Sequence, residues 1–449
     1  MRKAKRIFSL LLAVVLVMGL MTACGEKKDA ATSNDAAVST DDAKATGDTA
    51  ATDDAASTEP VTLKVVTMMG GTDPNTDKFH KVIEDFEAKY PNVTIEDGSQ
   101  VADQDWKVQI AADFAVDNEP DVIQFFTDSN ASDVLATDKF VPLSDIQAAY
   151  PEVAKNTSKG ALDATKSPLD GKNYAVPTTG YWEGLFCNKD LFDQYKLELP
   201  TDWDKLTKAI KTFKENGIVP IAVSLNDVPN YWIEFLMMSG SNAAEFTSIP
   251  EKAPEGWAAG LSYLKELRDM GAFPEDTDTI DNDMAGNLFK EKKAAMQLDG
   301  SWYLGGIPDQ DNTVVCTFPT VPNGKIEAGA AITGFSSGFY ITRKAWDDPA
   351  KREAAVNFLL ANTNDDQIIT YWGGNGACSV PVKEGVIDLT PLQLSGGEYS
   401  GTIAVPLAPT DSRMSQEAFT TLKDNIISVS TGDMTAEDAI NQMLEINNR

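Results

Sequence analysis

From Val61 to the C-terminus, residue patterns typical of buried strands alternate with patterns typical of amphipathic helices. This alternation restricts the possible folds more than any other feature of the chain. The β-branched run at Val61 to Met69 and the run at Asp121 to Phe126 are both typical of buried strands. Between them, apolar residues from Phe79 to Phe86 recur at helical spacing. The alternation predicts an α/β fold with mostly parallel sheets, divided between two lobes.

Helix-start signals and a further strand continue this pattern through the second half of the chain. Thr201 and Asp204 have the spacing of a capping box, in front of an apolar helical face that includes Trp203. Ile218 to Leu225 is typical of another buried strand. Further helix starts are predicted at Asp348–Pro349 and at Thr435–Asp438.

The charge of the chain excludes several classes of function. The 449 residues include 68 acidic and 38 basic side chains, which give a formal net charge of −30. Nucleic-acid binding needs a basic surface, so we do not expect a nucleic-acid partner. The single histidine, His80, cannot build a multi-histidine metal site, and no calcium-loop motif is present. We therefore expect no metal and no cofactor.

The N-terminus has the features of an export signal. A basic segment at 2–6 precedes an apolar run of 15 residues, Ile7 to Met21, which is shorter than the about 20 residues that span a bilayer. The run ends in Met21-Thr22-Ala23-Cys24, which resembles the start of a bacterial lipoprotein precursor. That resemblance implies a signal peptide at 1–23 and a lipid on the Cys24 sulfur. The alternative is an ordinary secretory signal with an incidental cysteine.

Residues 24–60 are predicted to form a disordered acidic tether. Between Glu26 and Glu59 there is no aromatic residue, and Val38 is the only large aliphatic one. Such a segment buries too little apolar surface to offset its chain entropy. A flexible chain of this length spans tens of ångströms, since its reach grows as roughly 5–6 Å × √n. A lipid followed by a tether implies a folded body that works outside the cell.

Three cysteines remain in the folded part, Cys187, Cys316 and Cys378. Because their number is odd, they form at most one disulfide, and the alternative is three small buried side chains. No two of them have the spacing of a redox or metal motif.

The loops after the predicted strands are the places to expect a ligand, because open α/β sheets bind ligands beyond the carboxyl ends of their strands. These loops are rich in aromatic, carboxamide and carboxylate side chains, and they span Gly70 to Asp73, Phe126 to Ser129, Asn226 to Trp232 and Asp299 to Trp302. Trp302 follows Gly300 in a strand-exit turn, which favours a binding role. Trp232, Tyr181 and Trp372 are equally compatible with packing and with binding, whereas Trp106, Trp203, Trp257 and Trp346 are expected to pack.

Aromatic rings beside acidic and amide groups are what a pyranose requires. The apolar C–H face of the sugar packs on a ring, while its hydroxyls need fixed donors and acceptors. The sequence therefore favours a carbohydrate as the ligand.

The chain resembles the extracellular family 1 solute-binding proteins, the sugar-capturing components of ABC importers. The resemblance rests on fragments in the order of the family, namely Phe79 to Thr94, Gly171 to Phe192 with Asn188-Lys189-Asp190, Pro200 to Pro220, and Phe289 to Trp302 ending in Gly-x-Trp. It covers nearly the whole chain after the tether.

The resemblance implies two α/β lobes joined by hinge strands, with the ligand between them. The first lobe would comprise 61–179 plus 338–380, and the second 180–337 plus 381–449. Trp302 would be the stacking tryptophan, Asp299 a polar contact and Tyr181 a contact at the hinge. No aromatic pair stands between Arg413 and Phe419, where maltose-type relatives stack sugar rings, which leaves Arg413 as a hydrogen-bond donor. The further candidate ligand contacts are Trp182, Trp232, Phe126, Asp128 and Trp372.

The same resemblance implies a non-enzymatic monomer held by its lipid at the outer face of the cytoplasmic membrane of a Gram-positive bacterium. Its partners would be a carbohydrate and the membrane subunits of an ABC permease. Three other readings stay open, namely a non-sugar solute such as a peptide or polyol, a secreted glycoside hydrolase with two carboxylates across its site, and a surface adhesin.

Overall fold

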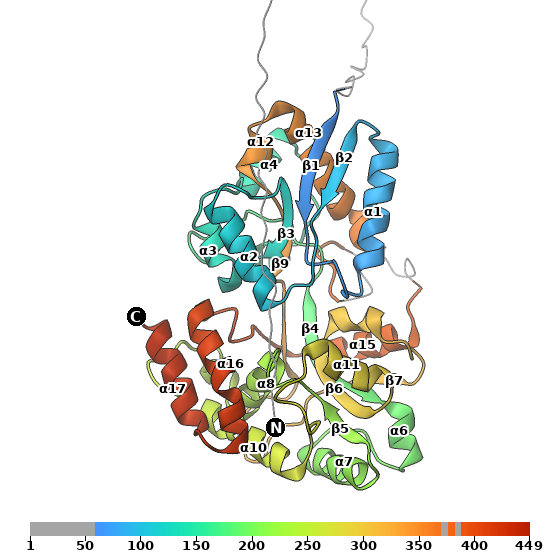
Figure 1. Ribbon diagram of the computed structural model, residues 1–449, viewed down its shortest axis with the longest axis vertical. Helices are drawn as coiled ribbons and strands as arrows, with labels where there is room; N and C mark the ends of the chain where they lie inside the picture. Colours follow the sequence, from blue (N-terminus) through green and yellow to red (C-terminus); the bar gives the residue numbers. More distant parts are fainter. Residues whose placement is uncertain (1–58, 370–375, 382–387) are drawn as a thin grey trace, which may run out of the picture. The chain divides into compact units, whose positions relative to one another are not determined.

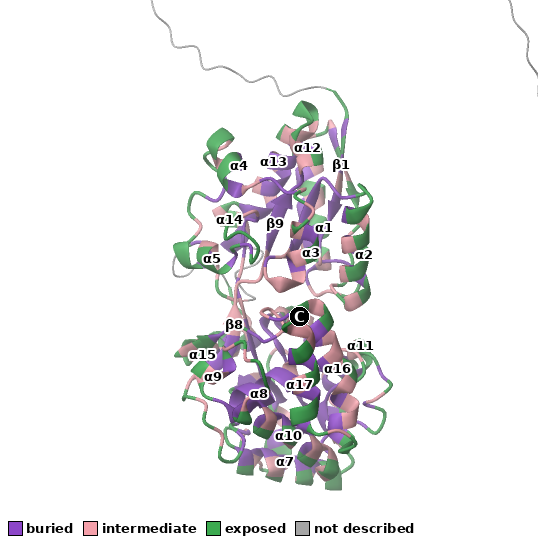
Figure 2. Cartoon of the chain, turned by 90° about the vertical axis from the view of Figure 1, so that its left-hand side faces the viewer, coloured by how far each residue is buried: buried purple, intermediate pink, exposed green. Residues whose placement is uncertain are grey.

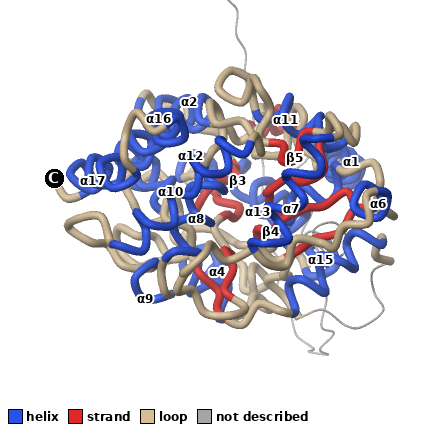
Figure 3. The backbone as a smooth tube through the Cα atoms, turned by 90° about the horizontal axis from the view of Figure 1, so that it is seen from below, coloured by secondary structure: helices blue, strands red, loops and turns tan. Residues whose placement is uncertain are grey.

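The computed structural model describes residues 59–369, 376–381 and 388–449, all within one compact unit that spans Ala56–Arg449. Its strands form two separate sheets, each covered by helices, and we call each sheet with its helices a lobe (Figure 1). This agrees with the α/β fold in two lobes that the sequence predicts. Figure 3 shows the backbone from below, with the strands in the interior and the helices around them. No described helix is long and apolar enough to cross a membrane.

The first lobe is formed by two separate stretches of the chain. The first stretch contains β1 (Val61–Val66), α1 (Thr76–Lys89), β2 (Val93–Asp97), α2 (Gln104–Ala115), β3 (Val122–Phe126), η1 (Ser129–Ala131), α3 (Ser132–Leu135), α4 (Leu143–Ala149) and α5 (Lys159–Ala164). The second contains β9 (Ser337–Ile341), α12 (Arg343–Trp346), α13 (Pro349–Thr363) and α14 (Asp365–Gln367).

The sheet of the first lobe has the order β2-β1-β3-β9. β1 pairs in parallel with β2 and β3, whereas β9 runs antiparallel to β3. The core forms where α13 packs on β1 and β9. Because β1 and β3 are parallel, their carboxyl ends at Val66 and Phe126 lie at the same edge of the sheet.

The second lobe also uses two stretches of the chain. The first contains β4 (Tyr181–Asn188), α6 (Lys189–Gln194), α7 (Trp203–Glu215), β5 (Val219–Ala222), α8 (Asn230–Gly240), α9 (Ala243–Phe246), α10 (Glu255–Met270), α11 (Asn282–Lys290), β6 (Ala294–Gly300), η2 (Ser301–Gly306), β7 (Thr313–Cys316) and β8 (Ala330–Gly334). The second contains α15 (Pro391–Gly401), β10 (Val405–Leu407), α16 (Gln416–Thr431) and α17 (Ala436–Asn447).

The sheet of the second lobe corrects the expectation of mostly parallel strands. Its order is β10-β8-β4-β6-β5, with β7 paired to β4. β4 runs antiparallel to β6, β7 and β8, and only the outer pairs β5–β6 and β10–β8 are parallel. A buried run in the sequence indicates a strand but does not fix its direction. A short buried strand has the same residue pattern whether it pairs in parallel or antiparallel.

The helix starts are mostly those that the sequence predicts. Asp348 caps α13 ahead of Pro349, and Thr435 caps α17 by accepting from the backbone N–H of Asp438. The predicted N-cap at Thr201 is wrong by one residue. Asp202 caps α7 instead, since its side chain accepts from the Lys205 backbone N–H at 2.9 Å.

The tryptophans that were expected to pack do so. Trp106, Trp203 and Trp257 are buried in the cores, and Trp346 is half-buried against Tyr150. Buried residues concentrate on the sheets and on α8 (Figure 2). The three described cysteines are free thiols; Cys187 and Cys316 are buried and Cys378 is partly buried.

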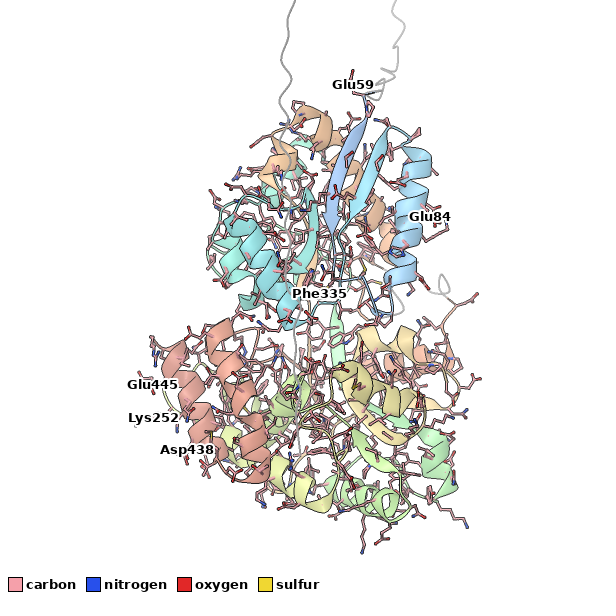
Figure 4. All side chains as sticks on the ribbon, viewed as in Figure 1. Glu59, Glu84, Lys252, Phe335, Asp438 and Glu445 are labelled. Atoms are coloured by element: carbon pink, nitrogen blue, oxygen red, sulfur yellow. The ribbon has the colours of Figure 1, made fainter. Side chains whose placement is uncertain are left out.

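Three chain segments join the two sheets. The chain enters β4 through Gly180, whose backbone N–H donates to the Ala377 carbonyl at 2.6 Å. Phe335 lies on the short connection from β8 to β9, where Figure 4 labels it. The bridges Val176–Phe339 and Thr179–Cys378 link all three segments. A Cβ atom on Gly376 would stand 2.2 Å from the Gly180 oxygen, so this crossing needs a glycine.

Candidate ligand-binding site

Three aromatic rings meet where the second sheet ends. The ring centroids of Tyr181 and Trp302 are 5.7 Å apart with an interplanar angle of 53°, and those of Tyr231 and Trp302 are 6.0 Å apart at 40°. We call Tyr181, Tyr231 and Trp302 the aromatic cluster. They come from the start of β4, the first turn of α8 and the turn after β6, and all three are partly exposed. The cluster therefore offers apolar ring faces that the core does not use.

Asp299 fixes the position of Trp302. Its carboxylate accepts hydrogen bonds from Gln297 Nε2 at 2.9 Å, from the Gly300 backbone N–H at 2.7 Å and from the Trp302 side chain. Burial raises the pKa of Asp299 to about 6, against the effect of these hydrogen bonds. The carboxylate is thus held rigidly beside the indole.

Glu183 lies two residues after Tyr181 on β4, so both side chains project from the same face of the sheet. Glu183 is 5% exposed, and its Oε2 atom has no hydrogen-bond partner. Burial, followed by the nearby carboxylates of Asp411 and Asp299, raises the pKa of Glu183 well above its usual value. An acceptor in this condition is costly unless something else pairs with it.

Glu234 and Asp411 extend the acidic region. Glu234 lies one turn after Asn230 on α8 and accepts from the Asp411 backbone N–H at 2.9 Å. Asn230 Nδ2 donates to Asp411 Oδ2 at 3.3 Å, while the Asn230 Oδ1 atom has no partner. Burial and the neighbouring Asp411 and Glu183 raise the pKa of Glu234 well above its usual value, and burial raises that of Asp411.

The first lobe contributes groups from β3, η1 and α2. Asp128 accepts from the Asn130 backbone N–H at 2.9 Å and from Asn130 Nδ2 at 2.8 Å. Burial, followed by repulsion from Asp411, raises the pKa of Asp128 to about 7. Lys107 Nζ lies 4.6 Å from the centroid of the Phe126 ring and 3.1 Å from Asn130 Oδ1. We call Asp128, Glu183, Glu234, Asp299 and Asp411 the carboxyl cluster.

Hydrogen bonds join the two lobes beside these groups. The Ser129 hydroxyl donates to the Asp411 carbonyl at 2.8 Å, and its backbone N–H donates to the Ser412 carbonyl at 3.3 Å. Gln416 Nε2 donates to Asn130 Oδ1. Asp128 and Asp411 therefore face each other across the junction between the lobes.

The structure brings together five of the residues that the sequence nominates: Trp302, Asp299, Tyr181, Phe126 and Asp128. It adds Tyr231, Glu183, Glu234, Asp411 and Lys107, which were not nominated. Strand periodicity could have identified Glu183. Side chains two positions apart on a strand share a face, so Glu183 lies on the face of Tyr181, whereas Trp182 lies on the opposite one.

Two nominated tryptophans lie in the cores instead of at the site. Trp182 is 3% exposed and packs edge-on against Tyr399, with ring centroids 5.2 Å apart. Trp232 is 1% exposed and packs between Phe273 and Phe318. These placements correct the expectation of a ligand contact, because neither indole has a free face.

Arg413 also differs from its expected role. Its guanidinium donates to the carbonyls of Ser248 at 3.1 Å and Phe246 at 2.9 Å, and it lies over the Phe246 ring. These contacts support the loop before α16. Trp372, the remaining nominated residue, lies outside the described residues.

The arrangement suits binding by ring faces and oxygen acceptors. Within the described ranges, no three His, Cys, Asp or Glu side chains are grouped so that they could hold a metal ion. Two open hollows line α17, near Asp438 and Glu445 (Figure 4), but they are bordered mostly by polar and charged side chains and have no aromatic ring. The aromatic and carboxyl clusters are therefore the stronger candidate.

Comparisons with known proteins agree with this fold. The model of the bacterial extracellular solute-binding protein family matches residues 72–366. The multiple sugar-binding protein of Streptococcus mutans is 26% identical over 161 residues, which are 33% of this chain and 38% of that relative. The chain thus spans less than half the length of this curated relative.

Two solved structures are similar over almost their whole length. One, from work on xylan utilization by the thermophilic bacterium Caldanaerobius polysaccharolyticus, is 22% identical with a TM-score of 0.73, and the match covers 86% of this chain and 99% of that one. A chitin oligosaccharide binding protein gives 22% identity and a TM-score of 0.73, with 87% and 98% covered. At this identity the likeness establishes the two-lobed fold. Since the family model matches well over half of the sequence, the chain belongs to the bacterial extracellular solute-binding proteins.

Proposed function

We propose that this protein captures a carbohydrate, either a mono- or an oligosaccharide, outside the cell and delivers it unaltered to the permease of an ABC importer. The observation that carries the proposal is the aromatic cluster beside buried carboxyl groups. A pyranose packs its apolar face on a ring, and its hydroxyls need fixed acceptors such as Asp299 and Glu183. The similar proteins were described in connection with multiple sugars, xylan and a chitin oligosaccharide, which supports the same ligand class.

The proposed ligand contacts come from both lobes, which follow the boundaries 61–179 plus 338–380 and 180–337 plus 381–449. Trp302, Tyr181 and Tyr231 would stack on the sugar, while Asp299, Glu183 and Asp128 would accept hydrogen bonds, with Phe126 at the opposite side. A ligand that touches both lobes stabilises the closed state relative to the open one. A shift from 1:99 to 99:1 requires a preference of about 5.5 kcal/mol, which two or three ring contacts and several hydrogen bonds supply.

The proposed location is the outer face of the cytoplasmic membrane of a Gram-positive bacterium. Residues 1–23 would be removed as a signal peptide, a lipid on Cys24 would anchor the monomer, and residues up to 60 would act as the tether. A single acyl chain binds membranes only marginally, so stable anchoring needs a lipid of several chains. The tether would let the binding protein reach a permease in the same membrane.

A thermal-shift screen of the purified protein against mono-, di- and oligosaccharides tests the proposal, because a specific ligand raises the melting temperature by mass action. Polyols and short peptides in the same screen test the non-sugar reading. The proposal predicts stabilisation by at least one sugar and none by the peptides. Stabilisation by peptides alone would overturn it.

A second assay separates capture from hydrolysis. The carboxyl cluster contains groups with raised pKa values, which a glycoside hydrolase also needs. Prolonged incubation with the stabilising oligosaccharide should release no reducing ends. Release of reducing ends would identify an enzyme instead, and retention on immobilised glycan without binding of free sugar would identify an adhesin.

A further inference from the structure

The carboxyl cluster contains more acidic groups than there are basic groups that act on it. Of its five acids, Asp411 acts electrostatically on Asp128, Glu183 and Glu234, and Asp299 acts on Glu183. The basic groups that act on them are Lys107 from α2, Lys423 from α16, Arg413 from the loop before α16 and Lys290 at the end of α11. Arg413 already uses guanidinium donors on three backbone carbonyls, those of Pro409, Ser248 and Phe246. The raised pKa values of these acids mean that their charged forms lack enough partners, and a cationic ligand would supply one.

Glu183 supplies an independent sign that a donor is missing. Its side chain is more than nine-tenths buried, and Oε2 has no hydrogen-bond partner. The side chain projects from the β4 face that carries Tyr181, and its charge acts on both Tyr181 and Tyr231. Glu183 is thus an unpaired acceptor directed toward the aromatic cluster.

The three rings of the aromatic cluster are tilted relative to one another and do not form one flat platform. Relative to the Trp302 indole, the Tyr181 ring is tilted by 53° and the Tyr231 ring by 40°, with centroids about one ring diameter away. Because all three residues are partly exposed, a ligand group can lie against their electron-rich faces. An ammonium group near such faces is stabilised by cation–π attraction.

A bare metal ion does not fit these groups. Within the described residues, no three potential ligands are close enough to hold one.

We propose that the ligand carries a protonated amine, as an amino sugar does, and that this amine lies in the aromatic cluster and pairs with Glu183. This rests on the proposed function, because it specifies the class of sugar that the same site takes. The net charge of −30 acts in the same direction, since it raises the local concentration of cations and speeds their encounter with the site.

Titration calorimetry with three oligosaccharide series tests the proposal. Chitosan, chitin and cellulose oligomers of equal length share one backbone and differ at the 2-position, which carries an ammonium, an acetamide or a hydroxyl group. The proposal predicts that, at pH 6 and low salt, the chitosan oligomers bind at least about tenfold more tightly than the chitin and cellulose oligomers. Equal or tighter binding of the chitin or cellulose oligomers would overturn the amine assignment and leave carbohydrate capture intact. Binding of spermidine in place of every sugar would overturn carbohydrate capture, and binding of none would overturn both.

Two variants connect the preference to the named residues. Glu183→Gln keeps the shape of the side chain and removes its charge, so it should weaken chitosan binding about tenfold and cellulose-oligomer binding by less than about threefold. Tyr231→Leu removes one ring of the aromatic cluster and should also reduce the preference for the amine. The control is Glu437→Gln on the exposed side of α17, which removes one charge far from the site. Equal losses for charged and neutral oligomers in Glu183→Gln would contradict the proposal.

Discussion

The Trp302 indole lies directly against the backbone of Gly300. A Cβ atom at position 300 would stand 2.2 Å from Cη2 of the indole, so no larger residue leaves the ring in place. The Gly300 backbone is extended, with φ −104° and ψ 173°, which any residue can adopt. Gly300 is therefore needed for the close approach of the ring and not for an unusual backbone conformation.

Gly300→Ala should displace the indole and leave the fold intact. The clashing atoms are the far end of a side chain, which can rotate away, so the cost falls on the aromatic cluster. We expect about tenfold weaker sugar binding, measured by calorimetry, with an unchanged circular dichroism spectrum. The matched control is Gly397→Ala in α15, where an added Cβ meets nothing within 4 Å. Full affinity in Gly300→Ala would show that the position of the indole does not matter for binding.

Trp302→Ala should remove most of the ligand-induced change in tryptophan fluorescence. The substitution removes the indole and with it the contacts to Tyr181, Tyr231 and the ligand. We therefore expect the free energy of sugar binding to weaken by more than about 1.5 kcal/mol. Trp346→Phe on the first lobe is the control, because Trp346 packs against Tyr150 and Arg352. A folded Trp302→Ala protein with unchanged affinity would exclude this residue from the site.

Asp128→Asn should stabilise the protein in a pH-dependent way. The pKa of Asp128 is raised to about 7 by burial and by Asp411, whereas its usual value is 3.8. The folded state therefore binds the proton more tightly, and its stability falls as the pH rises from about 4 to 7. Asparagine has no charge and still caps η1. We expect the melting temperature of the variant to exceed that of the wild type by about 2 °C or more at pH 8, with no difference near pH 4.

Asp202→Asn provides the control of opposite sign. A hydrogen bond from the Lys205 backbone N–H, followed by the Lys205 side chain, lowers the pKa of Asp202. A lowered pKa contributes stability above the usual value, and this stability is lost as the pH falls. The variant should therefore melt below the wild type at pH 8 and approach it at acid pH. The same pH trend in both variants would refute the electrostatic account of Asp128.

Cys24→Ser should release the protein from membranes. The proposed lipid on the Cys24 sulfur would anchor the protein, and the described residues contain no helix that can span a bilayer. Fractionation of cells into membrane and soluble pools measures the change. Retention of Cys24→Ser in the membrane pool would count against lipidation.

The elements of the fold could be predicted from the sequence because their signals are local. The apolar run at Val61, the cap at Asp348 and the core position of Trp203 each depend on a few neighbouring residues. The direction of β4 depends on partners far away in the chain, and local periodicity carries no information about it.

The candidate site could be predicted only in part for the same reason. Asp299 lies at the end of β6 and Trp302 in the turn that follows it, so one strand end identifies both. Trp182 and Trp232 were nominated by residue type, and the structure buries them because strand and helix geometry direct them into the cores. Asp411 meets Asp128 only through the tertiary fold, which no pattern near either residue indicates.

The crystal structure of the protein with the oligosaccharide that binds most tightly is the most direct test of sugar capture by the aromatic cluster. The account predicts density for a sugar ring stacked on Trp302, with an acceptor oxygen of Glu183 or Asp299 within hydrogen-bond distance of the ligand. Density for the sugar at another surface, with the Trp302 ring faces uncovered, would contradict it.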